Sequence, residues 1–161
     1  MDVLVLYYSR SGNTKKLAEH VAEGVRSVDG VSAVVRSTQE VTRDDFVNAA
    51  GIIAGSPVYY GYMAADLKAV FDRLVDYRDR MEDKIGAAFA TSGHHAGGKE
   101  TTILSILQAM LINGMIVVGD PLDASGHYGV CCTGAPDART ASDARKLGRR
   151  VAALAGRLMG R

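Results

Sequence analysis

The N-terminal segment constrains the fold most strongly, because its hydrophobic period changes from that of a strand to that of a helix across one short polar turn. The run from Val3 to Leu6 is unbroken and apolar, which is typical of a parallel strand buried on both faces. After Thr14, the apolar residues Leu17 and Val21 recur at helical spacing. A strand that leads directly into a helix predicts an α/β fold, with a phosphate site where the helix begins.

The turn combines hydroxyl groups, an amide and free backbone N–H groups at the positive end of the helix dipole. Its residues are Ser9, Arg10, Ser11, Gly12, Asn13 and Thr14. The pattern lacks the Gly-x-x-x-x-Gly-Lys-Ser/Thr string of nucleoside triphosphate loops and the Gly-x-Gly-x-x-Gly fingerprint of dinucleotide loops. A bound triphosphate and a tightly held NAD are therefore disfavoured. The alternative is an ordinary turn whose polar residues only cap the helix.

Strand and helix patterns alternate along the whole chain. The expected strands are 2–8, 31–36, 51–55, 85–91 and 115–118, and the expected helices are 14–27, 42–49, 64–77, 100–113 and 139–158. The polar segment 120–137 is expected to be a loop. This order predicts one three-layer α/β domain over residues 1–161, with a five-stranded parallel sheet of order 2-1-3-4-5 and helices on both faces. Ligands of such sheets bind at the carboxyl ends of strands 1, 3 and 4.

Composition excludes several classes of function. The chain has 161 residues, 47% of them hydrophobic, and a formal net charge of +1. Its apolar runs are shorter than the roughly 20 residues that cross a bilayer, so we expect no membrane insertion and a cytoplasmic protein. The basic cluster at 145–150 has the spacing of a solvated helix face, so we expect no nucleic-acid partner. The adjacent Cys131 and Cys132 cannot link distant segments, which fits a reducing compartment.

The loop expected after the third strand, Gly-Ser-Pro-Val-Tyr-Tyr-Gly-Tyr-Met at 55–63, is rich in tyrosine. Large aromatic side chains on a loop expose apolar area unless something covers them, and a flat ring ligand would do so. Pro57 restricts the backbone, while Gly61 permits close approach of the main chain. The other interpretation is a partner surface formed by Tyr59, Tyr60 and Tyr62, and it predicts a homo-oligomer, a dimer or a tetramer.

The loop expected after the fourth strand, 91–99, contains three glycines and two histidines. Such a loop can direct several N–H groups at the polar edge of a ligand. His94 and His95 are adjacent, so their side chains diverge, and no third ligand has suitable spacing; we therefore expect no metal site. Either histidine, above a bound ring, would serve as a proton donor or would hydrogen-bond an acceptor oxygen. Two exposed histidines without a role are the alternative.

These three loops together resemble the flavodoxin-like family, in particular its WrbA-like branch of NAD(P)H:quinone oxidoreductases and the related small FMN reductases. The turn at 9–14 is similar to that family's Ser/Thr-x-Ser/Thr-Gly-x-Thr phosphate loop. The tyrosine loop resembles Gly-Thr-Pro-Thr-Arg-Phe-Gly-Asn-Met, and 97–103, Gly-Gly-Lys-Glu-Thr-Thr-Ile, resembles Gly-Gly-Gln-Glu-Gln-Thr-Ile. The triplet His127-Tyr128-Gly129 resembles a Pro-Tyr-Gly turn that approaches the flavin in relatives.

The resemblance implies a tightly but non-covalently bound FMN, with NAD(P)H as a diffusible electron donor and a quinone or similar small molecule as acceptor. The cofactor-binding residues that it implies are Ser9, Arg10, Ser11, Gly12, Asn13, Thr14, Pro57, Val58, Tyr59, Tyr60, Gly61, Thr91, Ser92, Gly93, His94, Gly97, Gly98 and Tyr128. His94, His95 and Tyr60 are the candidates for catalytic residues at the acceptor pocket. A histidine that faces the flavin in WrbA-like enzymes corresponds here to Asn113, which cannot shuttle a proton at neutral pH.

An electron carrier of the flavodoxin type is the alternative function. Such carriers are usually strongly acidic around the flavin, because the negative charge steers them to basic partners. The net charge of +1 therefore favours the oxidoreductase. Cys131 and Cys132 follow Tyr128 on the expected loop, where they either pack or take part in redox chemistry.

Overall fold

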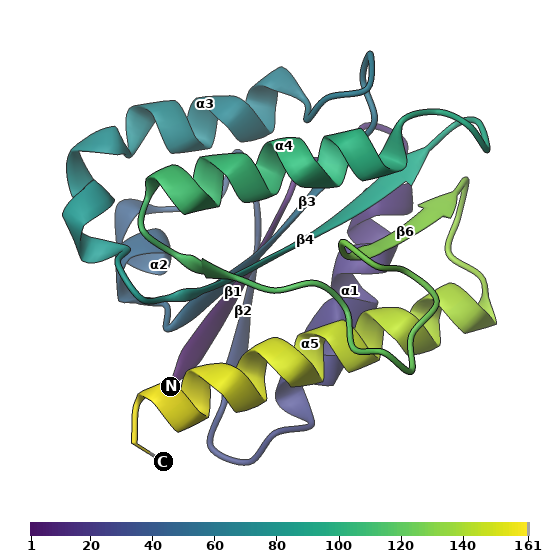
Figure 1. Ribbon diagram of the computed structural model, residues 1–161. Coiled ribbons are helices and arrows are strands. Elements are labelled where there is room, and N and C mark those ends of the chain that lie inside the picture. The colour runs from purple at the N-terminus through teal and green to yellow at the C-terminus, as the bar shows by residue number, and fades with distance from the viewer. Residues whose placement is uncertain (161) are drawn as a thin grey trace.

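The computed structural model describes residues 1–160, in which strands and helices alternate (Figure 1). The strands are β1 (Asp2–Tyr7), β2 (Ser32–Ser37), β3 (Gly51–Pro57), β4 (Ile85–Ser92), β5 (Ile116–Val117) and β6 (Val130–Thr133). The helices are α1 (Asn13–Arg26), α2 (Arg43–Asn48), α3 (Ala65–Arg73), the 3₁₀ helix η1 (Val75–Arg80), α4 (Lys99–Ile112) and α5 (Ala138–Leu158).

All paired strands of the sheet run parallel, in the order β2-β1-β3-β4-β5, which confirms the predicted topology. The fifth position is filled by two separate pieces. β5 pairs with the start of β4 at Ile85 and Gly86, and β6 pairs with its end, from Phe89 to Ser92. The expectation of a loop over 120–137 was therefore wrong for β6, a short apolar run that completes the edge of the sheet where the site lies.

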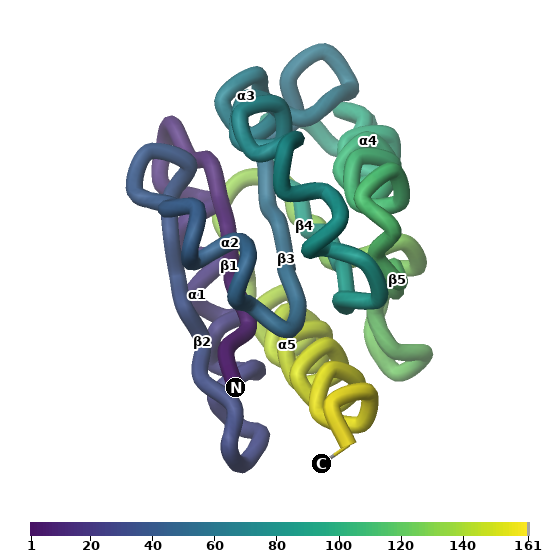
Figure 2. Tube along the Cα trace, turned by 90° about the vertical axis from the view of Figure 1, so that its left-hand side faces the viewer, coloured from purple at the N-terminus to yellow at the C-terminus, as the bar shows by residue number. Residues whose placement is uncertain are grey.

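Helices cover both faces of the sheet, as Figures 1 and 2 show from two directions. Side chains of β1 alternate between the two layers, because successive residues of a strand point to opposite faces. Leu4 and Leu6 pack against α2, α3 and α4, whereas Val3 and Val5 pack against α1 and α5. Both faces of the central strands are therefore buried, which explains their unbroken apolar sequences.

Helices α1 and α5 cross at two glycines that allow their backbones to touch. A Cβ atom at Gly24 would lie 1.9 Å from the carbonyl oxygen of Arg145, and one at Gly148 would lie 2.0 Å from that of Val21. The close crossing fixes the position of α1 against α5. The first residue of α1 lines the candidate site that is described below. No helix within residues 1–160 has the length and apolar character needed to cross a membrane.

The predicted helix over 64–77 was too long. α3 ends at Arg73, Leu74 leaves the helical region with φ −107° and ψ 12°, and the chain continues as η1. The buried stripe of α3 ends at Leu74, and none of the residues of η1 is buried. Without apolar surface to bury, the chain has little reason to extend the regular helix.

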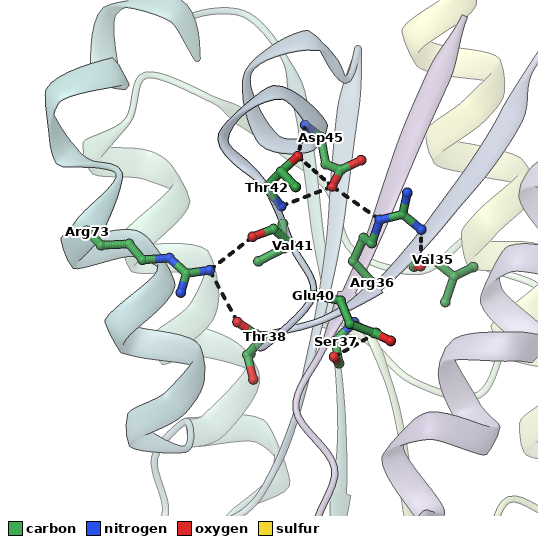
Figure 3. Close-up of polar contacts among 9 residues, drawn as sticks. All are labelled: Val35, Arg36, Ser37, Thr38, Glu40, Val41, Thr42, Asp45 and Arg73. Carbon is green, nitrogen blue, oxygen red and sulfur yellow. Dashed lines mark hydrogen bonds and ion pairs between the residues drawn. The ribbon is translucent and has the colours of Figure 1, made fainter.

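A polar network fixes the connection between β2 and α2 (Figure 3). Asp45 accepts hydrogen bonds from the backbone N–H and the hydroxyl of Thr42, at 3.0 and 2.8 Å, and Thr42 accepts one from the Asp45 N–H at 3.1 Å. This reciprocal capping box confirms the predicted cap of α2. Arg73 of α3 donates to the carbonyls of Thr38 and Val41, both at 3.2 Å. The segment is thereby held beside the turn at 9–14.

Candidate functional site

The loops that follow β1, β3 and β4 meet at one edge of the sheet and enclose a pocket of about 240 Å³. Its lining residues are Arg10, Ser11, Asn13, Thr14, Pro57, Val58, Tyr59, Thr91, Ser92, Gly93 and Gly134. All of these except Gly134 belong to the predicted cofactor-binding set. The parallel topology brings the loops together, because the strands that precede them are neighbours and end at the same edge.

The first loop leaves the start of α1 open to a ligand. Gly12 occupies the N-cap position in the left-handed region, at φ 92°, and no side chain caps the helix. Its own N–H donates to the hydroxyl of Ser9 at 3.1 Å, which tightens the turn. The first N–H groups of α1 have no acceptor within the helix, so they can donate to an anion together with the hydroxyl of Ser11.

The start of α4 has the same form, with Gly98 at φ 92° and no side-chain cap. α2 and α5 do not border the pocket, and the side chains of Thr42 and Asp137 cap them, whereas α3 also begins without a side-chain cap. Helices without such a cap usually satisfy their first N–H groups with water or a ligand. The donors of α1 and α4 are therefore available at the edge of the sheet where the pocket lies.

Buried hydrogen bonds fix the relative positions of the three loops. The hydroxyls of Thr14 and Thr91 lie 2.8 Å apart, and both residues are almost fully buried. The N–H of Val58 donates to the carbonyl of Thr91 at 2.8 Å, which ties the second loop to the third. The pocket wall is thus organised by contacts within the protein, which reduces the ordering that ligand binding requires.

The second loop contains a tight hairpin. Tyr59 and Tyr62 exchange backbone hydrogen bonds of 3.1 and 3.0 Å, and between them Tyr60 and Gly61 have φ values of 53° and 75°. Positive φ at both central residues defines a type I′ turn, which is unusual for a tyrosine. Tyr60 is fully exposed, whereas Tyr59 lies against the edge of Tyr8 with ring centroids 6.3 Å apart. The hairpin thus places one aromatic ring in the pocket wall and another in solvent.

Ser56 and Ser105 anchor the base of this hairpin. The buried hydroxyl of Ser56 donates to the carbonyl of Pro57 at 2.7 Å and accepts from the N–H of Ala64 at 2.8 Å. The N–H of Met63 donates to the hydroxyl of Ser105 on α4 at 3.1 Å. Both ends of the loop are therefore fixed, although its tip is exposed.

The third loop packs directly on this hairpin. A Cβ atom at Gly98 would lie 2.9 Å from the Cα of Gly61, so only glycine fits this contact and the positive φ together. The hydroxyl of Ser92 donates to the carbonyl of His94 at 2.7 Å and holds the start of the loop. The side chains of His94 and His95 are exposed and have no hydrogen-bond partner within the described chain. Their catalytic role, like that of Tyr60, stays a prediction.

Two residues outside the three loops, Asn113 and Tyr128, were also expected to approach the ring. Asn113 ends α4, where its amide donates to the carbonyl of Ala109 at 2.7 Å. A helix of this length spans roughly 20 Å, so Asn113 lies far from the pocket at the opposite end of α4 and does not replace a histidine beside the ring. Tyr128 is half-exposed and does not line the pocket. Contact between Tyr128 and the cofactor stays a prediction.

Cys131 and Cys132 lie in β6 and not on a loop. Cys132 packs with α1 and α5, whereas Cys131 packs with the opposite layer, as the alternation of a strand requires. Burial raises the pKa of the Cys131 thiol and raises that of Cys132 to about 11. Both thiols are therefore protonated at neutral pH and poorly nucleophilic, which favours packing over redox chemistry.

A second pocket, of about 290 Å³, lies on the other side of the first loop. Arg10 and Lys15 line it together with Tyr8 and the segment 37–39, of which Figure 3 shows Ser37 and Thr38. Neither cation makes an ion pair with another residue of the described chain. No carboxylate lines either pocket, so the charged side chains in their walls are basic, although the carboxylate of Glu40 lies nearby and accepts a hydrogen bond from Ser37.

Sequence reasoning missed two residues at this site. Gly134 follows β6 and donates from its N–H to the carbonyl of Ser92 at 2.8 Å. The run from Val130 to Thr133, with a glycine on either side, was the signal for the missing strand. Lys99 is buried at the start of α4, and the signal was a basic residue directly after a glycine at the positive end of a helix.

Comparisons with known proteins agree with this architecture. The sequence model of a family described as NADPH-dependent FMN reductase matches residues 32–128. A protein named flavodoxin from Aquifex aeolicus is 39% identical over 157 residues, which cover 93% of this chain and 84% of the relative. A protein named NAD(P)H dehydrogenase (quinone) from Archaeoglobus fulgidus is 35% identical over 188 residues, which cover 97% of this chain and 98% of the relative.

Among solved structures, a flavodoxin described as a WrbA-like protein from Agrobacterium tumefaciens has a TM-score of 0.83 at 23% identity, covering 97% of this chain and 98% of its own. This likeness confirms the flavodoxin-like fold. FMN, bound without a covalent link, is the cofactor of the matched family, and the open start of α1 with its hydroxyls suits the FMN phosphate. The chain belongs to the NADPH-dependent FMN reductase family.

Proposed function

We propose that this protein is an FMN-dependent oxidoreductase that passes electrons from NAD(P)H to a quinone or a similar small acceptor. The observation that carries the proposal is the charge of the site. Arg10 and Lys15 line the two pockets, and no carboxylate does. A positive rim attracts an anionic nucleotide, whereas it opposes docking to a basic redox partner.

In this proposal the first loop holds the cofactor's phosphate. The N–H groups that open α1 donate to the phosphate, and the hydroxyls of Ser11 and Thr14 lie beside them in the same wall. Arg10 adds positive charge at the same place. The buried contact between Thr14 and Thr91 fixes the position of the first loop relative to the third loop.

The second and third loops hold the ring. Tyr59 and Val58 provide an apolar wall, and the backbone of 91–93 provides N–H groups for the polar edge of the ring. Bound FMN supplies the redox chemistry by accepting a hydride and then returning two electrons. The exposed Tyr60, His94 and His95 border the open side, where we expect donor and acceptor to enter in turn.

Anaerobic stopped-flow absorbance of the FMN-loaded protein tests this function. We expect rapid bleaching of the flavin by NADH or NADPH and rapid recovery after addition of a benzoquinone. Preference for one nucleotide would identify the donor. Protein that binds no FMN, or that stays oxidised with both nucleotides, would contradict the proposal.

The second candidate is a flavodoxin-type electron carrier, which the relative named flavodoxin supports. A carrier would bind FMN but would not be reduced by free nucleotide. Reduction of the bound FMN by a protein reductase, without bleaching by NADH or NADPH, would therefore favour this candidate. The absence of carboxylates from the pocket walls argues against it.

A further inference from the structure

Lys99 is a buried cation without an anionic partner. Its relative exposure is 9%, and it is the one basic side chain within residues 1–160 that is classed as buried. Its ammonium donates to the hydroxyl of Thr133 at 3.0 Å, and it forms no ion pair within the described chain. The hydrogen bond of the ammonium is partly buried, and partial loss of water around a cation without a negative partner is unfavourable.

The position of Lys99 in its helix adds to this cost. It is the first residue of α4, directly after the N-cap Gly98, and no side chain caps the helix. The positive end of the helix dipole lies there, so a cation is unfavourable and a nearby anion is favourable. Both the buried charge and the helix dipole would be stabilised by one negative charge close to this end of α4.

Lys99 does not line the pocket itself, but its ammonium is linked to the pocket wall through Thr133. Its acceptor, Thr133, precedes Gly134, which lines the pocket between the three loops. An ammonium has three N–H donors, and the structure shows one acceptor for them. Cys131 does not supply an anion, because burial raises the pKa of its thiol and keeps it neutral. The missing negative charge is therefore expected from a ligand.

We propose that Lys99 stabilises the negative charge that the FMN ring acquires on reduction, and this inference rests on the proposed function. A hydride from NAD(P)H brings two electrons and one proton to the ring, and oxidised nicotinamide leaves. The neutral ring thereby gains one negative charge, which is delocalised over its N1 and O2 atoms. The ammonium of Lys99 is present before reduction, so its interaction strengthens only in the reduced state.

Sulfite provides a test that does not depend on turnover. Its sulfur lone pair forms a bond to N5 of oxidised FMN, and the displaced electron pair places a negative charge on N1 and O2 without any other oxidant or reductant. We expect Lys99→Gln to weaken sulfite binding about tenfold and Lys99→Arg to change it little. Lys68→Gln, which removes an exposed lysine of α3, should leave it unchanged.

The midpoint potential of bound FMN provides the second readout. If Lys99→Gln weakens binding of reduced FMN tenfold more than that of oxidised FMN, the two-electron potential falls by about 30 mV. Equal sulfite affinity and potential in Lys99→Gln and the wild type would overturn the role of Lys99 and leave the proposed function intact. Equal losses in Lys99→Gln and Lys99→Arg would also overturn it, since the charge would then not be the cause. Failure of the wild type to bind FMN would instead contradict the proposed function.

Discussion

Thr14 and Thr91 join two of the site loops through one buried pair of hydroxyls, 2.8 Å apart. Thr14→Val or Thr91→Val alone leaves the other hydroxyl buried without a partner. We expect each to lower the free energy of unfolding of the FMN-free protein by about 1–3 kcal/mol. The double variant removes both polar groups, so its loss should be well below the sum of the two single losses.

Urea denaturation of the four proteins in this cycle measures the coupling. Thr101→Val is a matched control, because the Thr101 hydroxyl is exposed and donates only to the carbonyl of Gly98. Its effect should stay within about 0.5 kcal/mol. Strictly additive losses would show that the two hydroxyls do not interact in solution.

His94 and His95 differ from this pair because no contact within the described chain fixes their side chains. If one of them donates a proton to the acceptor, its replacement by alanine should lower kcat for quinone reduction roughly 100-fold. The affinity for FMN should change little, since neither imidazole lines the pocket. Adjacent side chains diverge, so the other single variant serves as the control. Unchanged turnover in both variants would exclude the role.

At the scale of elements, the segment 118–129 interrupts the edge strand and contains an unusual carboxylate. Asp120 is 5% exposed, and within residues 1–160 neither of its carboxylate oxygens accepts a hydrogen bond of normal geometry. Burial raises the pKa of Asp120. The nearby backbone N–H groups of Asp120 and Gly126 oppose this shift, the charge of Asp143 adds to it, and His127 opposes it. The folded state therefore binds the Asp120 proton more tightly than the unfolded state does.

This linkage predicts a pH-dependent effect of Asp120→Asn. The stability that the raised pKa contributes is present below the unfolded pKa of about 3.8 and is lost as the pH rises through the folded pKa. At pH 8 the wild type buries a charged group, so the asparagine variant should be more stable by about 1–3 kcal/mol. The difference should shrink as the pH approaches 4. Urea denaturation at both ends of this range measures it, and a difference independent of pH would contradict the argument.

The elements also show where sequence reasoning succeeded. The strands next to the site were predictable, because β1, β3 and β4 are buried on both faces and their sequences are apolar throughout. The cap at Thr42 was predictable because capping is local. β6 was missed because a strand of four residues becomes stable only through its neighbour β4. The burial of Lys99 depends on contacts with residues distant in sequence, such as Thr133, which no local pattern contains.

At the scale of the whole molecule, the topology was predictable and the surface was not. The alternation of strands and helices leaves few arrangements of a parallel sheet, and the order β2-β1-β3-β4-β5 is one of them. The position of the pocket was predictable from this topology, because loops after adjacent parallel strands meet at one edge of the sheet. Which side chains remain exposed depends on how helices pack. α4 is apolar around most of its circumference, and its exposed residues include Leu104, Leu111 and Ile112.

We propose that this apolar surface of α4 mediates a homo-oligomer. Leu104 lies one turn beyond Thr101, whose hydroxyl would be 3.4 Å from a Cβ atom at Gly61, and the exposed Tyr62 follows Gly61 in the hairpin. An exposed apolar patch of this kind is typical of subunit contacts. Sedimentation velocity over a range of concentrations should show a dimer or a larger species for the wild type.

Leu111→Glu tests the location of this contact, because it places a charge in the last turn of α4, where Leu111 and Ile112 are both exposed. We expect it to weaken self-association tenfold or more, equivalent to about 1.4 kcal/mol. Leu122→Glu makes the same chemical change at a fully exposed leucine of the segment 118–129 and should leave association unchanged. A wild type that sediments as a monomer at all concentrations would refute the oligomer. Equal effects of the two substitutions would place the contact elsewhere, because only Leu111 lies on α4.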